Sequence, residues 1–171
     1  DIENSLPLIL GNWDLLLQVL DNLVGNALKF SRKHGKIILR AYTWPDICVN
    51  SNTKEDNNAP FCKVISPLPR LRVEISDTGC GISQEDQRRI FERFYRVENA
   101  VHTEAGTGLG LSIVRGIIEK HGSEIRIASE SNLGTTFWFD LPLSQTDADE
   151  LLVESERKSR EWESDLEKEL N

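Results

Sequence analysis

Three short groups of residues have the types and spacing to bind a phosphorylated ligand. In the first, Asn22 and Asn26 are four residues apart and therefore project from one side of a helix, and Lys29 and Phe30 continue that side. Neutral amide oxygens can ligate Mg²⁺ without adding negative charge beside a phosphate chain, and a lysine ammonium can meet a phosphate as a point charge. Taken alone, this pattern is more often an ordinary polar helix face.

The second group is DTGCGI, residues 77–82, which follows an expected strand. The Asp77 carboxylate can accept a hydrogen bond from an exocyclic amine such as that of adenine, and such a charged bond contributes about 1.5–3 kcal/mol. Gly79 and Gly81 would allow the backbone to approach a flat ring closely. Taken alone, this group is more often a surface turn.

The third group is GTGLGL, residues 106–111, at the start of an expected helix. Backbone N–H groups at a helix N-terminus form an anion site. The spacing is not GxxxxGK[ST], which excludes a P-loop. It is not GxGxxG either, because Leu111 stands in the last position and no strand leads directly into it, which disfavours a Rossmann site.

Helices and strands alternate around these groups. Apolar residues at helical spacing predict a helix over 13–30, with Asn12 as its N-cap and a stop at 33–35. Four of the six prolines fall within residues 44–69, which indicates a loop or insertion. The other expected elements are strands at 36–43, 61–65, 71–77, 124–129 and 135–141, helices at 84–94 and 111–121, and a turn at 132–134.

Length and composition limit the possible classes of protein. A chain of 171 residues with 39% hydrophobic and 28% charged residues suits one packed domain. No apolar run approaches the length that spans a bilayer, and no segment is typical of a signal peptide. The net charge of -8 is concentrated in residues 144–171, which hold ten acidic and four basic side chains. An acidic chain without a basic stripe disfavours nucleic acid as a partner.

The cysteines indicate a reducing compartment. Cys48, Cys62 and Cys80 form neither a disulfide framework nor a CxxC metal clip, which favours reduced thiols in the cytoplasm over redox-sensitive ones. The sequence contains no methionine, even at residue 1. We therefore expect the chain to be a piece of a longer protein.

In this order, the three groups resemble the N, G1 and G2 boxes of the histidine-kinase catalytic and ATP-binding domain, within the ATPase family that includes gyrase B, Hsp90 and MutL. FERFYR at 91–96 looks like the F box of histidine kinases, and TTF at 135–137 resembles the strand that closes their adenine pocket. The resemblance covers residues 6–143. It implies a two-layer α/β sandwich, the Bergerat or GHKL fold, in which helices cover one face of a mixed, mainly antiparallel sheet.

By position, the resemblance also implies roles for single residues. Asn26 would be the principal Mg²⁺ ligand and Asn22 would support it, while Lys29 would contact phosphate and Phe30 would line the base pocket. Asn22 also stands where hydrolytic relatives have a glutamate that activates water, and an amide cannot act as that base. Transfer of phosphate to a protein histidine is therefore favoured over attack by water.

Asp77 would accept from the adenine amine, and Arg96 would stabilise the γ-phosphoryl group during transfer. Asn22, Lys29 and Arg96 form the expected catalytic set, and residues 97–110 the mobile ATP lid. The other residues implied to bind the cofactor are Gly79, Gly81, Ile82, Phe94, Gly106, Thr107, Gly108, Leu109, Gly110, Leu111 and Thr135.

The resemblance implies two partners: a histidine-containing dimerisation domain of the parent kinase, and the receiver domain of a response regulator. None of His34, His102 and His121 lies in a phosphoacceptor context, so the isolated chain is expected not to phosphorylate itself. Two alternatives remain, namely a nucleotide-binding interaction module without transfer activity, and an ATPase or serine kinase of the same fold.

We expect a catalytic and ATP-binding domain over residues 1–143, followed by an acidic helical tail over 144–171. The domain's first helix and edge strand are expected to lie before residue 1. The opening helix and the 44–69 insertion look most like the cyanobacterial and plastid sensor kinases of the NblS type. The parent would then be membrane-bound, while this part of it would make no membrane contact.

Overall fold

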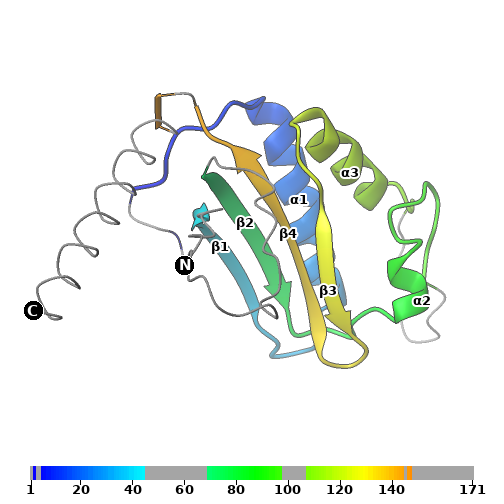
Figure 1. Ribbon diagram of the computed structural model, residues 1–171. Coiled ribbons are helices and arrows are strands. Elements are labelled where there is room, and N and C mark those ends of the chain that lie inside the picture. Colours follow the sequence, from blue (N-terminus) through cyan, green and yellow to red (C-terminus); the bar gives the residue numbers. More distant parts are fainter. Residues whose placement is uncertain (1, 3–4, 45–68, 98–106, 145, 148–171) are drawn as a thin grey trace, which may run out of the picture.

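The computed structural model describes residues 2, 5–44, 69–97, 107–144 and 146–147. Its elements are α1 (Trp13–Phe30), β1 (Ile37–Trp44), β2 (Arg70–Asp77), α2 (Gln84–Gln87), α3 (Gly110–Lys120), β3 (Arg126–Glu130) and β4 (Gly134–Pro142). The strands form one antiparallel sheet in the order β1-β2-β4-β3. Helices α1 and α3 lie side by side behind one face of this sheet (Figure 1). The expected two-layer α/β sandwich is confirmed.

Helix α1 has the bounds that its sequence predicts. The N–H of Leu15 donates to Asn12 Oδ1 at 3.1 Å, so that Asn12 caps the first turn as expected. Val19, Leu23 and Ala27 recur every four residues and are all buried. The regular helix ends at Phe30, before the predicted stop at residues 33–35.

Helix α3 packs against α1 and buries Val114, Ile117 and Ile118 in the hydrophobic core. His121 follows its last residue and joins the two helices. The N–H of Asn12 donates to His121 Nε2 at 3.0 Å, which leaves His121 Nδ1 to donate to Ile117 O at 2.8 Å. The start of α1 is thereby fixed to the end of α3.

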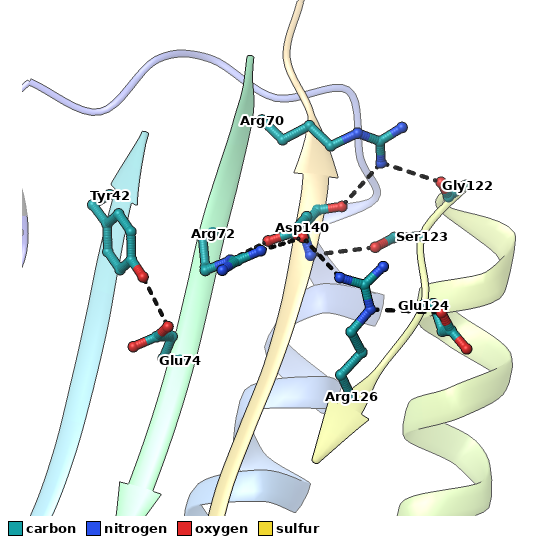
Figure 2. Close-up of polar contacts among 9 residues, drawn as sticks. All are labelled: Tyr42, Arg70, Arg72, Glu74, Gly122, Ser123, Glu124, Arg126 and Asp140. Carbon is teal, nitrogen blue, oxygen red and sulfur yellow. Dashed lines mark hydrogen bonds and ion pairs between the residues drawn. The ribbon is translucent and has the colours of Figure 1, made fainter. Parts of the chain in front are cut away.

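The two faces of the sheet differ in chemistry because side chains alternate along each strand. The face beneath the helices is apolar, and the register places Ile75 of β2 beside Phe137 of β4. The opposite face is polar, as Figure 2 shows. There Arg72 donates from Nε and Nη2 to the two oxygens of Asp140 at 2.6 and 2.8 Å, while the hydroxyl of Tyr42 donates to Glu74 at 2.8 Å.

A parallel bridge between Ile2 and Ala41 lies on the outer edge of β1, and an antiparallel bridge joins Ile9 to Leu143. The pairing among the described residues is therefore mixed but mainly antiparallel, as expected. Within the described part of the chain, no helix is long and apolar enough to cross a membrane.

The helix predicted over residues 84–94 begins at Gln84 as expected but is much shorter. Helix α2 ends at Gln87, and the chain continues in turns, in which the N–H of Glu92 donates to the carbonyl of Arg89, three residues earlier. Phe94 has a φ of 64°, which an α-helix does not accommodate. Its N–H instead donates to Gly108 O at 2.9 Å. This tertiary contact and the positive φ keep Phe94 out of a helix.

Several predictions fall outside the described residues. They are the strand at 61–65, most of the 44–69 insertion, Cys48 and Cys62, residues 98–106 of the expected lid, and the tail from residue 148.

Candidate functional site

A cavity of about 310 Å³ lies between α1, the turn after β2, residues 90–97, the start of α3 and strand β4. Most of the site residues predicted from sequence line this one cavity. They are Asn22, Asn26, Lys29, Phe30, Asp77, Gly81, Ile82, Arg96, Thr107, Gly108, Gly110, Leu111 and Thr135.

The cavity extends along α1. At one end Asn22 lies beside α3, since a Cβ on Gly110 would stand 2.7 Å from Asn22 Oδ1. At the other end Phe30 lies beside the turn after β2, because the N–H of Cys80 donates to Phe30 O at 3.3 Å. Eight residues of helix separate Asn22 from Phe30, which is about 12 Å. This length suits an extended ligand.

The amide of Asn22 has a defined orientation. Its Nδ2 donates to Gln18 O at 2.8 Å, one turn earlier in the same helix. The oxygen Oδ1 is therefore the atom that faces α3. Asn26 follows one turn later on the same side, and both are half-buried and line the cavity. The two side chains can offer neutral oxygen ligands to a cation.

Two basic residues line the same cavity. Lys29 Nζ lies 5.2 Å from the centroid of the Phe30 ring, within the range of a cation–π contact. Arg96 comes from the segment that precedes the glycine loop, and its side chain is exposed. Both cations can meet a polyanionic ligand.

Asp77 is the acidic residue among the described residues that line the cavity. Its Oδ1 accepts the N–H of Gly79 at 2.8 Å, and its carboxylate also accepts the backbone N–H of Thr135. Burial raises the pKa of Asp77 above its ordinary value, and these two backbone hydrogen bonds oppose the rise only in part. The carboxylate is thus desolvated and held by backbone groups.

The turn after Asp77 requires its glycines. A Cβ on Gly79 would lie 2.4 Å from Phe30 O, and one on Gly81 would lie 1.9 Å from Glu130 O. Gly81 also has a φ of 68°. The turn can therefore lie against both α1 and β3 only with glycine at these positions. Gly79 is buried and does not line the cavity, although the sequence pattern included it in the site.

The glycine loop before α3 is joined to the segment that resembles the F box. Gly108 has a φ of 70° and accepts the Phe94 N–H, and a Cβ there would lie 2.8 Å from the carbonyl carbon of Phe94. Phe94 is 72% exposed and does not line the cavity, so the expectation that it contacts the cofactor has no support in this geometry.

Leu109 and Gly106 have different outcomes. Leu109 stands at the N-cap position of α3, where its own side chain makes no capping hydrogen bond, and it does not line the cavity. Gly106 lies outside the described residues.

Five of the described lining residues were given no role from the sequence alone: Cys80, Ile90, Tyr95, Val97 and Phe137. All except Ile90 lie within the predicted motifs or the expected lid. Strand alternation could have found Phe137, two residues after Thr135. Tyr95 is positioned by its hydroxyl, which donates to Asp86 Oδ1 at 2.6 Å, and by Arg89, whose guanidinium carbon lies 4.3 Å from the ring centroid. The hydrogen bond to Asp86 raises the pKa of Tyr95. Since residues 88–97 form turns, no periodic pattern marks their inward side chains.

The comparisons with known proteins agree with this geometry. Residues 11–145 match the family described as histidine kinase-, DNA gyrase B-, and HSP90-like ATPase. Over 145 residues, or 85% of the chain, the sequence is 54% identical to drug sensory protein A of Synechocystis and 50% identical to the uncharacterized sensor-like histidine kinase ycf26 of Pyropia yezoensis. The chain spans only 20% and 21% of the length of these relatives.

Solved structures show the same likeness. The mycobacterial sensor histidine kinase MprB is 27% identical with a TM-score of 0.60, and the match covers 79% of this chain and 76% of that one. Full-length ShkA in complex with AMPPNP is 29% identical with a TM-score of 0.62, and the match covers 84% of this chain and 24% of that one. The expected likeness to sensor kinases of the NblS type is confirmed by the two curated relatives. The chain belongs to the histidine kinase-, DNA gyrase B- and HSP90-like ATPase family, and its similar relatives within that family are sensor histidine kinases.

Proposed function

We propose that this chain binds Mg·ATP in the cavity along α1 and donates the γ-phosphoryl group to a histidine of a dimerisation domain in the parent kinase. The cavity itself carries the proposal. It combines a half-buried acceptor, Asp77, with apolar walls, two basic side chains and the start of a helix. The AMPPNP complex of the similar ShkA supports a nucleotide as the ligand.

The residues that line the cavity fit both the adenine base and the phosphate chain of the ligand. Asp77 would accept from the adenine amine, and Phe30 and Ile82 would line the base. Lys29 would contact phosphate, as would the N-terminal N–H groups of α3, where positive potential favours an anion. The glycines of the loop before α3 would cover the phosphates as part of a lid over residues 97–110.

Mg²⁺ would be held by the amide oxygens of Asn26 and Asn22. Among the residues that the structure describes, no group of three or more His, Cys, Asp or Glu side chains could hold a metal ion, so the cation would depend on amide, phosphate and water oxygens. When bound, it would neutralise charge on the phosphates. The Asn22 amide cannot take a proton from water, and Arg96 would stabilise the γ-phosphoryl group as it is transferred.

The remaining proposals concern the parent protein. The dimerisation domain would supply the acceptor histidine, and a response regulator receiver would take the phosphoryl group from it. This domain would work in the cytoplasm, where ATP is available. We also propose that residues 1–143 form the ATP-binding domain and that a helical tail starts after Ser144. The hydrogen bond from the Asp147 N–H to Ser144 Oγ, at 3.3 Å, supports a helix start there.

Calorimetric titration with AMPPNP tests the binding step. Saturable binding that weakens without Mg²⁺ and in Asp77→Asn is expected. Asp14→Asn is the matched control, because Asp14 lies in the first turn of α1 and outside the cavity. Absence of binding to the folded wild-type chain, or equal loss in both variants, would contradict the proposal.

Transfer is tested with radiolabelled ATP and the separately purified dimerisation domain of the parent kinase. Acid-labile phosphate on the acceptor histidine is expected, and it should be lost in Arg96→Ala. Steady phosphate release without any acceptor would favour an ATPase instead. Good ATP binding with no transfer to the added domain would favour an interaction module.

A further inference from the structure

Asp77, Thr135 and Ser129 form a row across three neighbouring strands. The register pairs Asp77 of β2 with Thr135 of β4, and Thr135 with Ser129 of β3. Thr135 is 6% exposed and is the one buried polar residue among the described residues. It lines the cavity together with Asp77, while Ser129 lies behind it and does not.

The hydrogen bonds of Ser129 determine where its proton points. Its Oγ accepts the N–H of Ile82 at 2.8 Å, lies 2.8 Å from Gly134 O and lies 2.9 Å from Thr135 Oγ1. A hydroxyl has one proton to donate and two lone pairs. The Gly134 carbonyl can only accept, so the Ser129 proton is directed to it.

The direction of the Thr135 hydroxyl follows. Because Ser129 gives its proton to Gly134, the contact between Ser129 and Thr135 forms only if Thr135 donates. Ser129 then has one donated and two accepted bonds, which saturates its hydroxyl. Thr135 Oγ1 is left with acceptor capacity alone, so any group that meets this oxygen from the cavity has to donate to it.

The geometry is held from behind by Gln87 of α2. Its Nε2 donates to Ile82 O at 2.8 Å and to Ser129 O at 2.9 Å, which joins the turn after β2 to β3. These two hydrogen bonds hold the Ile82 N–H close to Ser129 Oγ. Every polar contact of the Ser129 hydroxyl is therefore fixed by backbone groups or by Thr135.

We propose that Ser129 is a positioning residue for nucleotide selectivity, which fixes Thr135 as an acceptor. Asp77 and Thr135 then form an acceptor pair that takes the two N–H groups of a purine 6-amino group, whereas a 6-oxo group at that position can donate to neither. The inference rests on the proposed function, since it assumes that the cavity binds a purine nucleotide. Ser129 acts through Thr135 and does not itself touch the base.

The test compares ADP with IDP, both with Mg²⁺, by calorimetric titration. The two bases differ in having a 6-amino group or a 6-oxo group with a proton on N1. The wild-type chain should bind ADP more tightly. In Ser129→Ala the Thr135 proton is released and can turn toward the cavity, so the ratio of ADP to IDP affinity should fall about two- to tenfold, the range of one neutral hydrogen bond. Ser129→Cys keeps the size of the side chain with a poorer hydrogen-bonding group, and should lower the ratio in the same direction.

A matched pair of variants tests the Thr135 step. Thr135→Val removes the acceptor and should also lower the ratio. Thr136→Val removes the neighbouring hydroxyl, which lies 2.9 Å from Ser76 Oγ, and should leave the ratio unchanged because Thr136 does not line the cavity.

The outcomes separate this inference from the proposed function. If the folded wild-type chain binds neither nucleotide, the proposed function fails and this inference fails with it. If it binds ADP but the Ser129 variants weaken ADP and IDP by the same factor, Ser129 has a structural role only and this inference alone is overturned.

Discussion

Asp77 and Asp140 lie on neighbouring strands but on opposite faces of the sheet, and their partners are of different kinds. Arg72 holds both oxygens of Asp140 at 2.6 and 2.8 Å, and Arg126 approaches it at 3.9 Å (Figure 2). Asp77 is held by the backbone N–H groups of Gly79 and Thr135, and burial raises its pKa. One carboxylate is thus neutralised by cations, whereas the other is desolvated.

This difference predicts a structural role for Asp140 and a binding role for Asp77. The Asp140 oxygens are committed to guanidinium groups, and the hydrogen bonds to Asp140 raise the pKa of Arg72 in turn. The carboxylate of Asp77 lines a cavity, and an ionised group held there lowers the stability of the fold. A perturbed carboxyl in a cavity is a candidate functional group. We therefore expect Asp77 to matter for binding and Asp140 for stability.

The largest expected effect is that of Asp77→Asn on nucleotide affinity. The change removes a charged acceptor, so ADP should bind about 10- to 100-fold more weakly, which corresponds to one charged hydrogen bond. Calorimetric titration measures the effect, and circular dichroism checks the fold. An affinity within twofold of wild type would remove Asp77 from the site.

Asp140→Asn should lower the stability of the fold and leave the affinity for ADP unchanged. It leaves Arg72 without its bidentate carboxylate, and both side chains are largely buried, at 13% and 15% exposure. We expect the free energy of unfolding to fall by about 2 kcal/mol, in the range for hydrogen bonds to charged groups. Urea denaturation measures the loss. ADP affinity measured on the folded fraction should not change, and a large change would show that the two faces are coupled.

The pH dependence of Asp77 should also differ from that of an ordinary paired carboxylate. Because its pKa is raised from 3.8 in the folded chain, the folded state binds this proton more readily than the unfolded state. Asp77 therefore contributes fully to the free energy of unfolding below the pKa that it has in the unfolded chain. This contribution is lost as the pH rises through the higher pKa that it has in the folded chain. Asp77→Asn should be more stable than wild type at neutral pH, and the difference should shrink as the pH falls toward 3.8.

Urea denaturation of both proteins at several pH values measures this difference. ADP affinity of the wild-type chain should decrease over the same range, because protonation removes the acceptor. A stability difference that does not depend on pH would contradict the raised pKa.

Much of the fold could be predicted because its signals are local. The cap at Asn12 and the four-residue spacing of buried side chains define α1, and alternation defines the inner residues of β2 and β4. Residues 84–94 could not be predicted in this way. The helix ends at Gln87, and the N–H of Phe94 bonds to Gly108, fourteen residues later; no local signal encodes that contact.

The candidate site shows the same limit. Asn22, Asn26 and Asp77 were found by spacing and by position at the end of a strand. Ser129 and Gln87 were not, since the partners of a hydroxyl or an amide across strands depend on register and on side-chain direction. Sequence motifs thus identified many residues that line the cavity. The residues that orient them from behind could be identified only from the structure.

The smallest expected effect is that of Tyr42→Phe on the polar face. The Tyr42 hydroxyl donates to Glu74 at 2.8 Å, and burial followed by this bond raises its pKa. Glu74 keeps a second partner in Arg40, at 3.8 Å. The free energy of unfolding should therefore fall by less than about 1 kcal/mol, as for a single partly exposed hydrogen bond. Urea denaturation measures the change, and Asp140→Asn serves as the larger reference on the same face.

ADP affinity should stay unchanged in Tyr42→Phe, because Tyr42 and Glu74 lie on the face opposite the cavity. If Tyr42→Phe weakened ADP binding, the polar face would be part of the binding machinery, and the division of roles between Asp77 and Asp140 would not hold.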